Sequence, residues 1–146
     1  MVVADTSAML ALLDRGDAHH KAFARLYLEN RHAWVLPWAI LAEIDYLTAR
    51  RLGARAQMAW FDDLVTSAYS VEWGRDDDLS AARTLAGKYA SLEMGLVDAI
   101  VMCVAERLGA DIATLDLRHF GAVRLKHTPR LLPRDTGAPL RRGRPA

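Results

Sequence analysis

The hydrophobic and polar positions of this chain alternate between short apolar runs and longer stretches with helical spacing. The short runs predict strands at residues 1–4, 33–36, 69–73, 112–115 and 123–126. Apolar residues three or four positions apart predict helices at residues 7–14, 17–30, 37–52, 54–66, 79–90 and 96–108, with a helical turn at 116–120. Because the strands alternate with helices and are short and apolar, we expect an α/β fold, with helices on both sides of a parallel sheet.

Composition is that of one ordinary domain. The chain has 146 residues, of which 52% are hydrophobic and 25% are charged. Its formal charge of +1 is unevenly distributed, because residues 130–146 hold five arginines and one acid. We therefore expect a mildly acidic folded domain at residues 1–129 and a basic, disordered tail at residues 130–146. The tail could contact nucleic acid or a partner, or it could simply keep the chain soluble.

Targeting signals are not evident. The first residues lack the basic flank and apolar run of a signal peptide, and the longest uninterrupted apolar stretch, residues 99–105, is too short to span a bilayer. We therefore expect a cytoplasmic protein without a membrane partner.

Four acidic residues each interrupt an apolar stretch. Asp5 and Asp116 follow predicted strands, where sites of parallel α/β sheets lie, while Glu43 and Asp98 have apolar neighbours at helical spacing. Charged residues are rarely buried unless they are paired or bind a metal. Taken singly, Asp5 and Asp116 could instead cap the helices that follow them, and Asp98 could be an N-cap or first-turn acid. Glu43, expected in mid-helix, is harder to explain in this way.

Brought together in one cleft, these acids would repel one another and would need a cation. Carboxylates suit the hard ions Mg²⁺ and Mn²⁺, and neither His nor Cys accompanies the acids at zinc-like spacing. Such ions activate water and stabilise charge on a phosphodiester. The histidines, including His119, are interpreted as surface residues that need no function, although Arg118 could meet a phosphate.

Three blocks of the sequence carry a family resemblance: VVADTSAMLALLD at residues 2–14, LPWAILAEIDYL at 36–47 and GLVDAIVMCVAERLGADIATLDLRHF at 95–120. With their intervals, they resemble the PIN-domain nucleases and, among these, the VapC toxins of toxin–antitoxin pairs. The resemblance implies a three-layer α/β/α sandwich around a central parallel sheet. It also implies a Mg²⁺- or Mn²⁺-dependent endoribonuclease, usually a homodimer, that is inhibited by a cognate antitoxin.

Carried over by position, the resemblance assigns the family's catalytic and metal-binding acids to Asp5, Glu43, Asp98 and Asp116. Thr6, Ser7 and Thr114 match hydroxyl residues that could orient a carboxylate or a metal-bound water. Helix capping and ordinary strand content are equally good explanations for these three hydroxyl residues.

The function that follows is hydrolysis of RNA phosphodiesters by a metal-activated water, in the toxin of a VapBC-type module. A catalytically silent PIN-like module that binds RNA or protein remains an alternative. A haloacid-dehalogenase-type phosphatase also places an aspartate after its first strand, but the second aspartate of its DxDxT motif is absent after Asp5.

Overall fold

A parallel sheet organises the molecule. The computed structural model describes residues 1–137, and within them five strands pair in the order β3-β2-β1-β4-β5. These strands are β1 (Val2–Ala4), β2 (Trp34–Pro37), β3 (Ser70–Glu72), β4 (Asp111–Ala113) and β5 (Leu131–Leu132). Every neighbouring pair in this sheet is parallel, as the alternation of strands and helices predicted.

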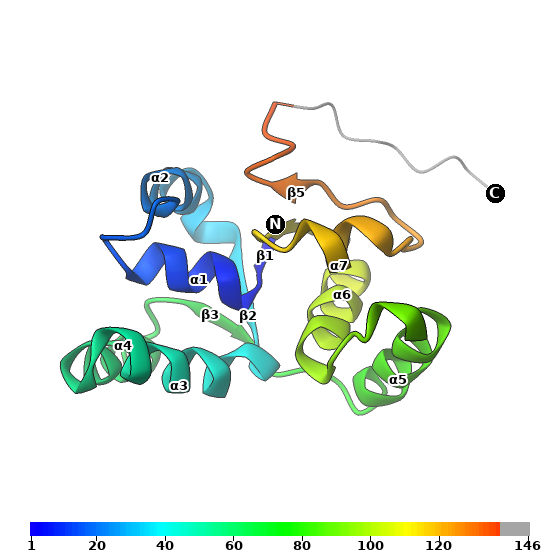
Figure 1. The fold of residues 1–146 in the computed structure, drawn as a ribbon, viewed down its shortest axis with the longest axis horizontal. Coiled ribbons are helices and arrows are strands. Elements are labelled where there is room, and N and C mark those ends of the chain that lie inside the picture. Colours follow the sequence, from blue (N-terminus) through cyan, green and yellow to red (C-terminus); the bar gives the residue numbers. More distant parts are fainter. Residues whose placement is uncertain (138–146) are drawn as a thin grey trace.

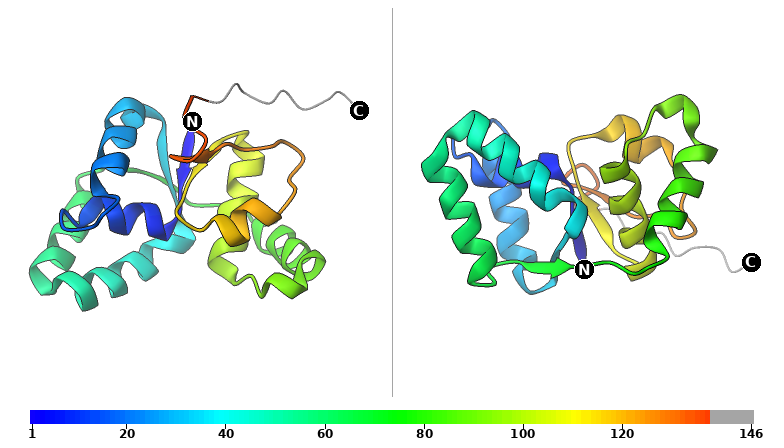
Figure 2. Two further views of the ribbon diagram at one scale, coloured as in Figure 1. Left: turned by 45° about the horizontal axis from the view of Figure 1, so that its top comes forward. Right: turned by 90° about the horizontal axis from the view of Figure 1, so that it is seen from below.

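Helices cover both faces of the sheet. The α-helices are α1 (Thr6–Leu13), α2 (His20–Asn30), α3 (Leu41–Leu52), α4 (Ala54–Val65), α5 (Asp78–Lys88), α6 (Leu96–Leu108) and α7 (Leu117–Ala122). Short 3-10 turns lie at η1 (Arg31–Ala33), η2 (Trp38–Ile40) and η3 (Ala90–Leu92). Helices α1 to α4 lie on one side of the sheet and α5 to α7 on the other (Figures 1 and 2). The predicted three-layer α/β/α sandwich is confirmed.

The core explains why β1 and α6 are so apolar in sequence. Val2, Val3 and Ala4 are all buried, because β1 is a central strand with helices on both faces. Helix α6 packs on β1 and β2 on one side and on α5 on another, so it is buried around most of its circumference. Its buried residues are Ala99, Ile100, Val101, Met102, Val104 and Ala105. None of the helices in the described part of the chain has the length and hydrophobicity that a membrane span needs.

Two predicted elements differ from the structure. The helix expected at 37–52 is divided into η2 and α3, so that Glu43 lies in the first turn of α3 and not in mid-helix. The strand expected at 123–126 was wrong: these residues form no strand, and Val123 and Leu125 pack against the core without joining a ladder.

The edge strand β5 lies instead within the predicted tail. Leu131 and Leu132 pair with Ile112 and Ala113 of β4 and are buried. The guanidinium of Arg130 donates to the Asp111 carboxylate, with Nη2 2.6 Å from Oδ2, and this ion pair fixes the register. Residues 138–146 of the predicted tail lie outside the described residues.

The sheet order places a topological switch between β1 and β4. The chain builds outward from β1 through β2 to β3, and then returns to the other side of β1 for β4 and β5. Loops leaving the carboxyl ends of β1 and β4 diverge at this point and leave a crevice. Asp5 and Thr114 are the first residues after these two strands.

Candidate active site

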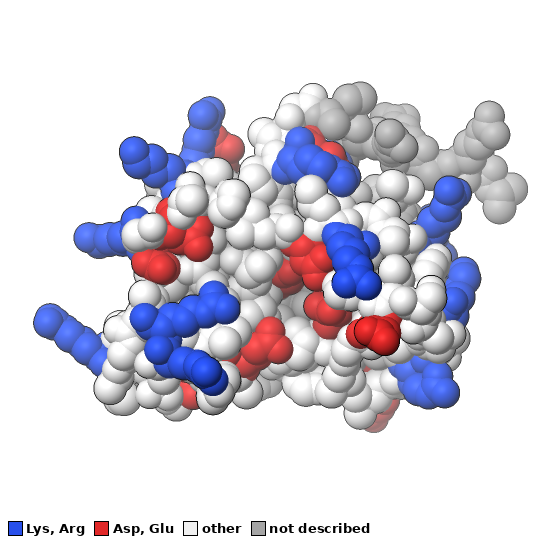
Figure 3. Space-filling model, in the orientation of Figure 1, with Lys and Arg blue, Asp and Glu red and all other residues white. Residues whose placement is uncertain are grey.

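The crevice at the switch point is a cleft of about 300 Å³ that contains all four predicted acids. The described residues that line it are Asp5, Thr6, Ser7, Leu10, Asp17, Glu43, Leu47, Arg51, Asp98, Leu115 and Asp116. Acidic side chains gather in the middle of this face, between the α1–α3 and α6–α7 sides, while most Lys and Arg side chains project from its edges (Figure 3). The tertiary structure therefore brings together acids that are far apart in sequence.

Each of these acids is positioned by the start of a helix. Asp5 is the N-cap of α1 and Asp116 is the N-cap of α7, each accepting a backbone N–H three residues on. Glu43 and Asp98 lie in the first turns of α3 and α6. Asp5 and Asp116 therefore cap helices and also line the cleft, and a helix N-terminus stabilises a carboxylate at such a position.

Asp5 is the most firmly held of the four acids. Its Oδ1 accepts hydrogen bonds from Ser7 Oγ at 2.7 Å and from the backbone N–H of Ala8 at 3.0 Å. Its Oδ2 accepts a hydrogen bond from Thr114 Oγ1 at 2.5 Å. Two lone pairs per oxygen leave one acceptor position on Oδ2 for a further ligand.

The same two hydroxyls connect Asp5 to the loop after β4. Ser7 Oγ accepts the backbone N–H of Leu115 at 2.9 Å, and Thr114 Oγ1 accepts the backbone N–H of Asp116 at 2.9 Å. Each hydroxyl therefore donates to Asp5 and accepts from the segment that carries Asp116. Of the three hydroxyl residues singled out in the sequence, Thr6 differs: its Oγ1 is buried and has no hydrogen-bond partner among the described residues.

Burial gives Asp5 unusual acid–base behaviour. The side chain is only 5% exposed, and this desolvation raises its pKa from 3.8 to about 6, although the three donors oppose the change. The negative charge of Asp98 raises it further. Burial also raises the pKa of Asp98. The charge of His119 opposes this rise, while the negative charges of Asp116 and Glu43 add to it. Asp98 is thus the electrostatic centre of the cluster, repelled by all three other acids.

His119 lies beside Asp98 and Asp116, a position that the sequence did not reveal. His119 Nδ1 lies 2.7 Å from Asp116 Oδ2 and 4.0 Å from Asp98 Oδ2. Its Nε2 lies 2.8 Å from the carbonyl oxygen of Leu92. Both ring nitrogens therefore face acceptors, which favours the imidazolium form. The hydrogen bond to Asp116 accordingly raises the pKa of His119.

His119 also shifts its acidic partner. Burial alone would raise the pKa of Asp116, but hydrogen bonds from the backbone and side chain of His119 outweigh it and lower this pKa. The prediction that His119 lies on the surface was wrong, because its side chain is only 20% exposed and lies against Asp116 and Asp98. The signal was its spacing: His119 follows Asp116 by three residues on the helix that Asp116 caps, which puts both on one face.

The donor set fits a divalent cation. Ligand atoms of Asp98, Asp116 and His119 all lie within 4.8 Å of one another, and Asp5 and Glu43 line the same cleft. Burial raises the pKa of both Asp5 and Asp98, and negative charges of neighbouring acids add to the rise, so a cation beside them would favour their ionised forms. Carboxylate oxygens are the ligands that hard divalent ions prefer.

The chain matches known proteins in sequence and in fold. The PIN domain family matches residues 2–125. The chain belongs to the PIN-domain family. This PIN domain is 32% identical to Ribonuclease VapC26 of Mycobacterium tuberculosis (strain ATCC 25618 / H37Rv) over 124 residues, which cover 84% of the chain and 92% of the relative.

Solved structures show the same fold. The crystal structure of VapC20 of Mycobacterium tuberculosis, described as a toxin that cleaves the sarcin-ricin loop, superposes with a TM-score of 0.75 at 25% identity. That match covers 84% of this chain and 95% of VapC20. A DNA-bound VapBC from Salmonella typhimurium matches with a TM-score of 0.68 at 17% identity, over 89% of this chain and 95% of that one. At that identity, the Salmonella structure supports the fold alone.

Proposed function

We propose that this PIN domain is a metal-dependent endoribonuclease that acts as the toxin of a VapBC-type toxin–antitoxin module. The observation that carries the proposal is the single cleft in which Asp5, Glu43, Asp98 and Asp116 converge at the carboxyl ends of the strands. The relative that is named a ribonuclease supports RNA as the substrate class, and the matched structure of a sarcin-ricin-loop-cleaving toxin supports action as a toxin.

In this proposal Asp5, Glu43 and Asp98 hold a Mg²⁺ or Mn²⁺ ion, and Asp116 completes or tunes the site. When bound, such an ion supplies Lewis-acid activation of water and stabilises charge on the phosphodiester. The chain supplies the positioning. Ser7, Ala8 and Thr114 fix the Asp5 carboxylate so that it need not reorganise when its ligand arrives.

His119 has a different part in the proposed site. Its Nδ1–H holds the Asp116 carboxylate toward Asp98, while the carbonyl of Leu92 fixes the other side of the ring. A cationic ring at this place acts to lower the pKa of both Asp98 and Asp116, and so partly offsets the repulsion between the two carboxylates.

The proposed biological setting includes a cognate antitoxin, a homodimer and the cytoplasm. The antitoxin partner is proposed because this chain shares its fold with the VapBC structure from Salmonella typhimurium. Co-expression with the product of the adjacent gene, followed by purification through a tag on the toxin, tests this part. A stable complex whose formation suppresses RNA cleavage is the expected result, and a partner that leaves cleavage unchanged contradicts it.

The activity itself is tested with purified protein, cellular RNA, and either Mg²⁺, Mn²⁺ or EDTA. We expect cleavage that requires the ion and leaves 5′-phosphate and 3′-hydroxyl ends. Glu43→Gln and Asp5→Asn should abolish it, whereas Glu29→Gln, the same chemical change at an exposed position of α2, should cleave normally.

The alternative is a PIN-like module that binds RNA or protein without cutting. No metal-dependent cleavage of any RNA by the unmodified chain, under conditions where it remains folded, would establish that alternative. Cleavage that persists in Asp5→Asn and Glu43→Gln would instead place the chemistry outside this cleft.

A further inference from the structure

The cleft has a marked excess of one charge along its length. Five acidic residues line it, and among the described lining residues Arg51 is the one Lys or Arg side chain. A strand of RNA carries a negative charge at every nucleotide, so a bound cation at the acids can compensate only the phosphate beside it. The neighbouring phosphates of the strand need a positive group elsewhere in the cleft.

Arg51 is the described lining residue of the cleft that could supply that group. Glu43, Leu47 and Arg51 are spaced by four residues and share one face of α3, and all three line the cleft. Eight residues of helix correspond to about 12 Å along the axis. Arg51 therefore lies about two helical turns along α3 from Glu43, in the part of the cleft that Leu10 and Asp17 also line.

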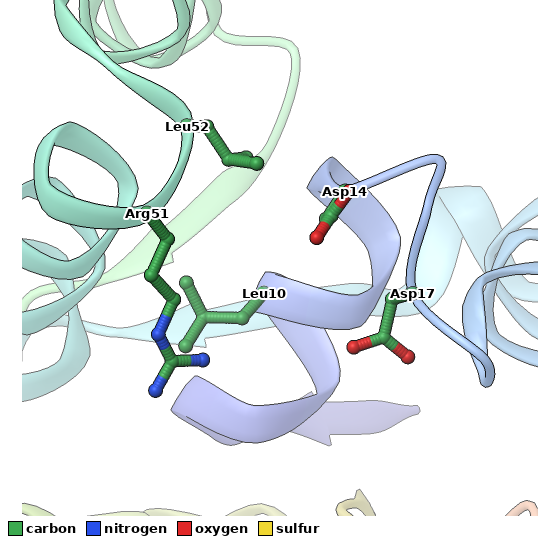
Figure 4. Close-up of a pocket in the computed structure, with 5 residues that line it drawn as sticks. All are labelled: Leu10, Asp14, Asp17, Arg51 and Leu52. Carbon is green, nitrogen blue, oxygen red and sulfur yellow. The ribbon is translucent and has the colours of Figure 1, made fainter.

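Arg51 is exposed, and the stem of its side chain lies beside α1. It also lines a small recess next to the cleft, together with Leu10, Asp14, Asp17 and Leu52. Figure 4 shows its aliphatic part beside Leu10 of α1 and its guanidinium apart from the carboxylates of both aspartates. Packing of the stem on apolar surface leaves a charged head directed to solvent.

The acids of this recess are engaged elsewhere. Asp14 Oδ1 accepts the backbone N–H of Gly16 at 2.9 Å, and Asp17 Oδ1 accepts the backbone N–H of His19 at 2.7 Å. These bonds shape the loop between α1 and α2. Within residues 1–137, the guanidinium of Arg51 has no hydrogen-bond or ion-pair partner, so its donors are available to a ligand.

We propose that Arg51 binds a phosphate of the RNA strand one or more nucleotides away from the bond that is cut, on the α1–α3 side of the cleft. This inference rests on the proposed function and adds a specific substrate contact to it. A planar guanidinium matches the paired oxygens of a phosphate. Because the contact is remote from the reacting atoms, it stabilises bound substrate and transition state equally.

The variants Arg51→Gln and Arg51→Lys test this contact, with Arg50→Gln as a matched control. Arg50 is adjacent on α3 and exposed, but it does not line the cleft, and its Nη1 donates to the hydroxyl of Tyr46 at 2.8 Å. Arg50→Gln thus removes the same charge from the same helix turn. A general effect of surface charge on RNA binding would appear in both variants, whereas a specific contact appears only at Arg51.

Kinetics give the first readout, with an RNA that the unmodified chain cleaves. Arg51→Gln should raise KM about tenfold and leave kcat unchanged, as expected for loss of one hydrogen bond to a charged group. Arg51→Lys should recover part of the loss, since it keeps the point charge without the planar fork.

Binding gives the second readout, independent of turnover. A short fluorescein-labelled RNA that spans the mapped cleavage position is titrated with the Glu43→Gln chain, with and without Arg51→Gln, at several salt concentrations. The added substitution should weaken binding about tenfold and reduce the slope of log affinity against log salt by about 0.7, the value for one phosphate of a single strand.

The outcomes separate this inference from the proposed function. If the unmodified chain cleaves RNA but Arg51→Gln matches it in KM, affinity and salt slope, or if Arg50→Gln shows the same losses, the Arg51 contact is refuted and the nuclease function stands. If Arg51→Gln weakens only the complex with the antitoxin, the residue binds protein and the inference fails. If the unmodified chain cleaves no RNA, both fail together.

Discussion

Replacement of Asp5 by asparagine is expected to stabilise the metal-free protein at neutral pH, although Asp5 is central to the proposed site. The reason is that Asp5 is buried and its pKa is raised from 3.8 to about 6. The folded protein therefore binds a proton at Asp5 more tightly than the unfolded chain does. Stability from this group is fully present below pH 3.8 and is lost as the pH rises through about 6.

The size of the effect follows from the pKa. A difference between 3.8 and about 6, at 1.36 kcal/mol per pKa unit, corresponds to about 3 kcal/mol of lost stability once Asp5 is ionised. Asparagine keeps an oxygen that can accept from Ser7 and Ala8, but it loses the acceptor that faces Thr114, at a cost of about 1 kcal/mol. A net gain of about 2 kcal/mol at pH 7.5 remains.

Urea unfolding in EDTA, between pH 4 and pH 7.5, measures this effect. Other carboxylates titrate over the same range, so the informative quantity is the difference in unfolding free energy between Asp5→Asn and the unmodified chain. That difference should increase by about 2 to 3 kcal/mol across the range. Asp76→Asn, at an exposed position outside the cleft, changes the net charge equally and serves as the control.

Adding Mn²⁺ should then reverse the order of stability, because an ion that binds only the folded state stabilises the unmodified chain by about 2.7 kcal/mol at one hundred times its dissociation constant. Asp5→Asn should gain much less. A difference that does not vary with pH, or a variant that is the less stable chain at pH 7.5 in EDTA, would refute the argument that burial of Asp5 is energetically costly in the metal-free fold.

Three further predictions concern neighbouring parts of the fold. Thr114→Val keeps the shape of the side chain but removes the hydrogen bond that the hydroxyl donates to Asp5, so Mn²⁺ affinity in calorimetric titration should fall about tenfold or more. Arg107→Ala leaves the buried Asp78 carboxylate without its ion pair and should cost about 3 kcal/mol or more in urea unfolding, while Arg25→Ala, from an exposed pair, should cost less than about 1 kcal/mol. Leu131→Ala should cost about 2 to 4 kcal/mol in the same assay if β5 is part of the cooperative fold, and an unchanged midpoint would contradict that.

Much of the site was predictable from local sequence, because its chemistry is placed by local rules. Asp5 and Asp116 each follow a strand and precede a helix, so the strand end directs them to the crevice and the helix start stabilises their charge. Glu43 and Asp98 were recognisable because a carboxylate among apolar neighbours needs a reason to be there. The parallel sheet followed from short apolar runs that only a doubly covered sheet can bury.

Contacts between distant segments decided the rest. A two-residue strand such as β5 has no period to recognise, and it forms because Arg130 pairs with Asp111 nineteen residues away. Its register is thus a property of β4 as much as of its own sequence. The run at 123–126 has a better strand pattern, yet it finds no ladder partner, because the edge of β4 is already occupied.

By itself, the sequence determined the segments that become β1 to β4, the helices between them, and the four acids that are chemically conspicuous. Only the tertiary structure decided that Ser7 and Thr114 tie Asp5 to the loop of Asp116, that His119 joins the acids, and that Arg51 faces the same cleft. The physical reason is the distance along the chain over which each effect acts. Periodicity and capping act within a few residues, whereas pKa values, ion pairs and clefts depend on groups that only the sheet order brings within a few ångströms of one another.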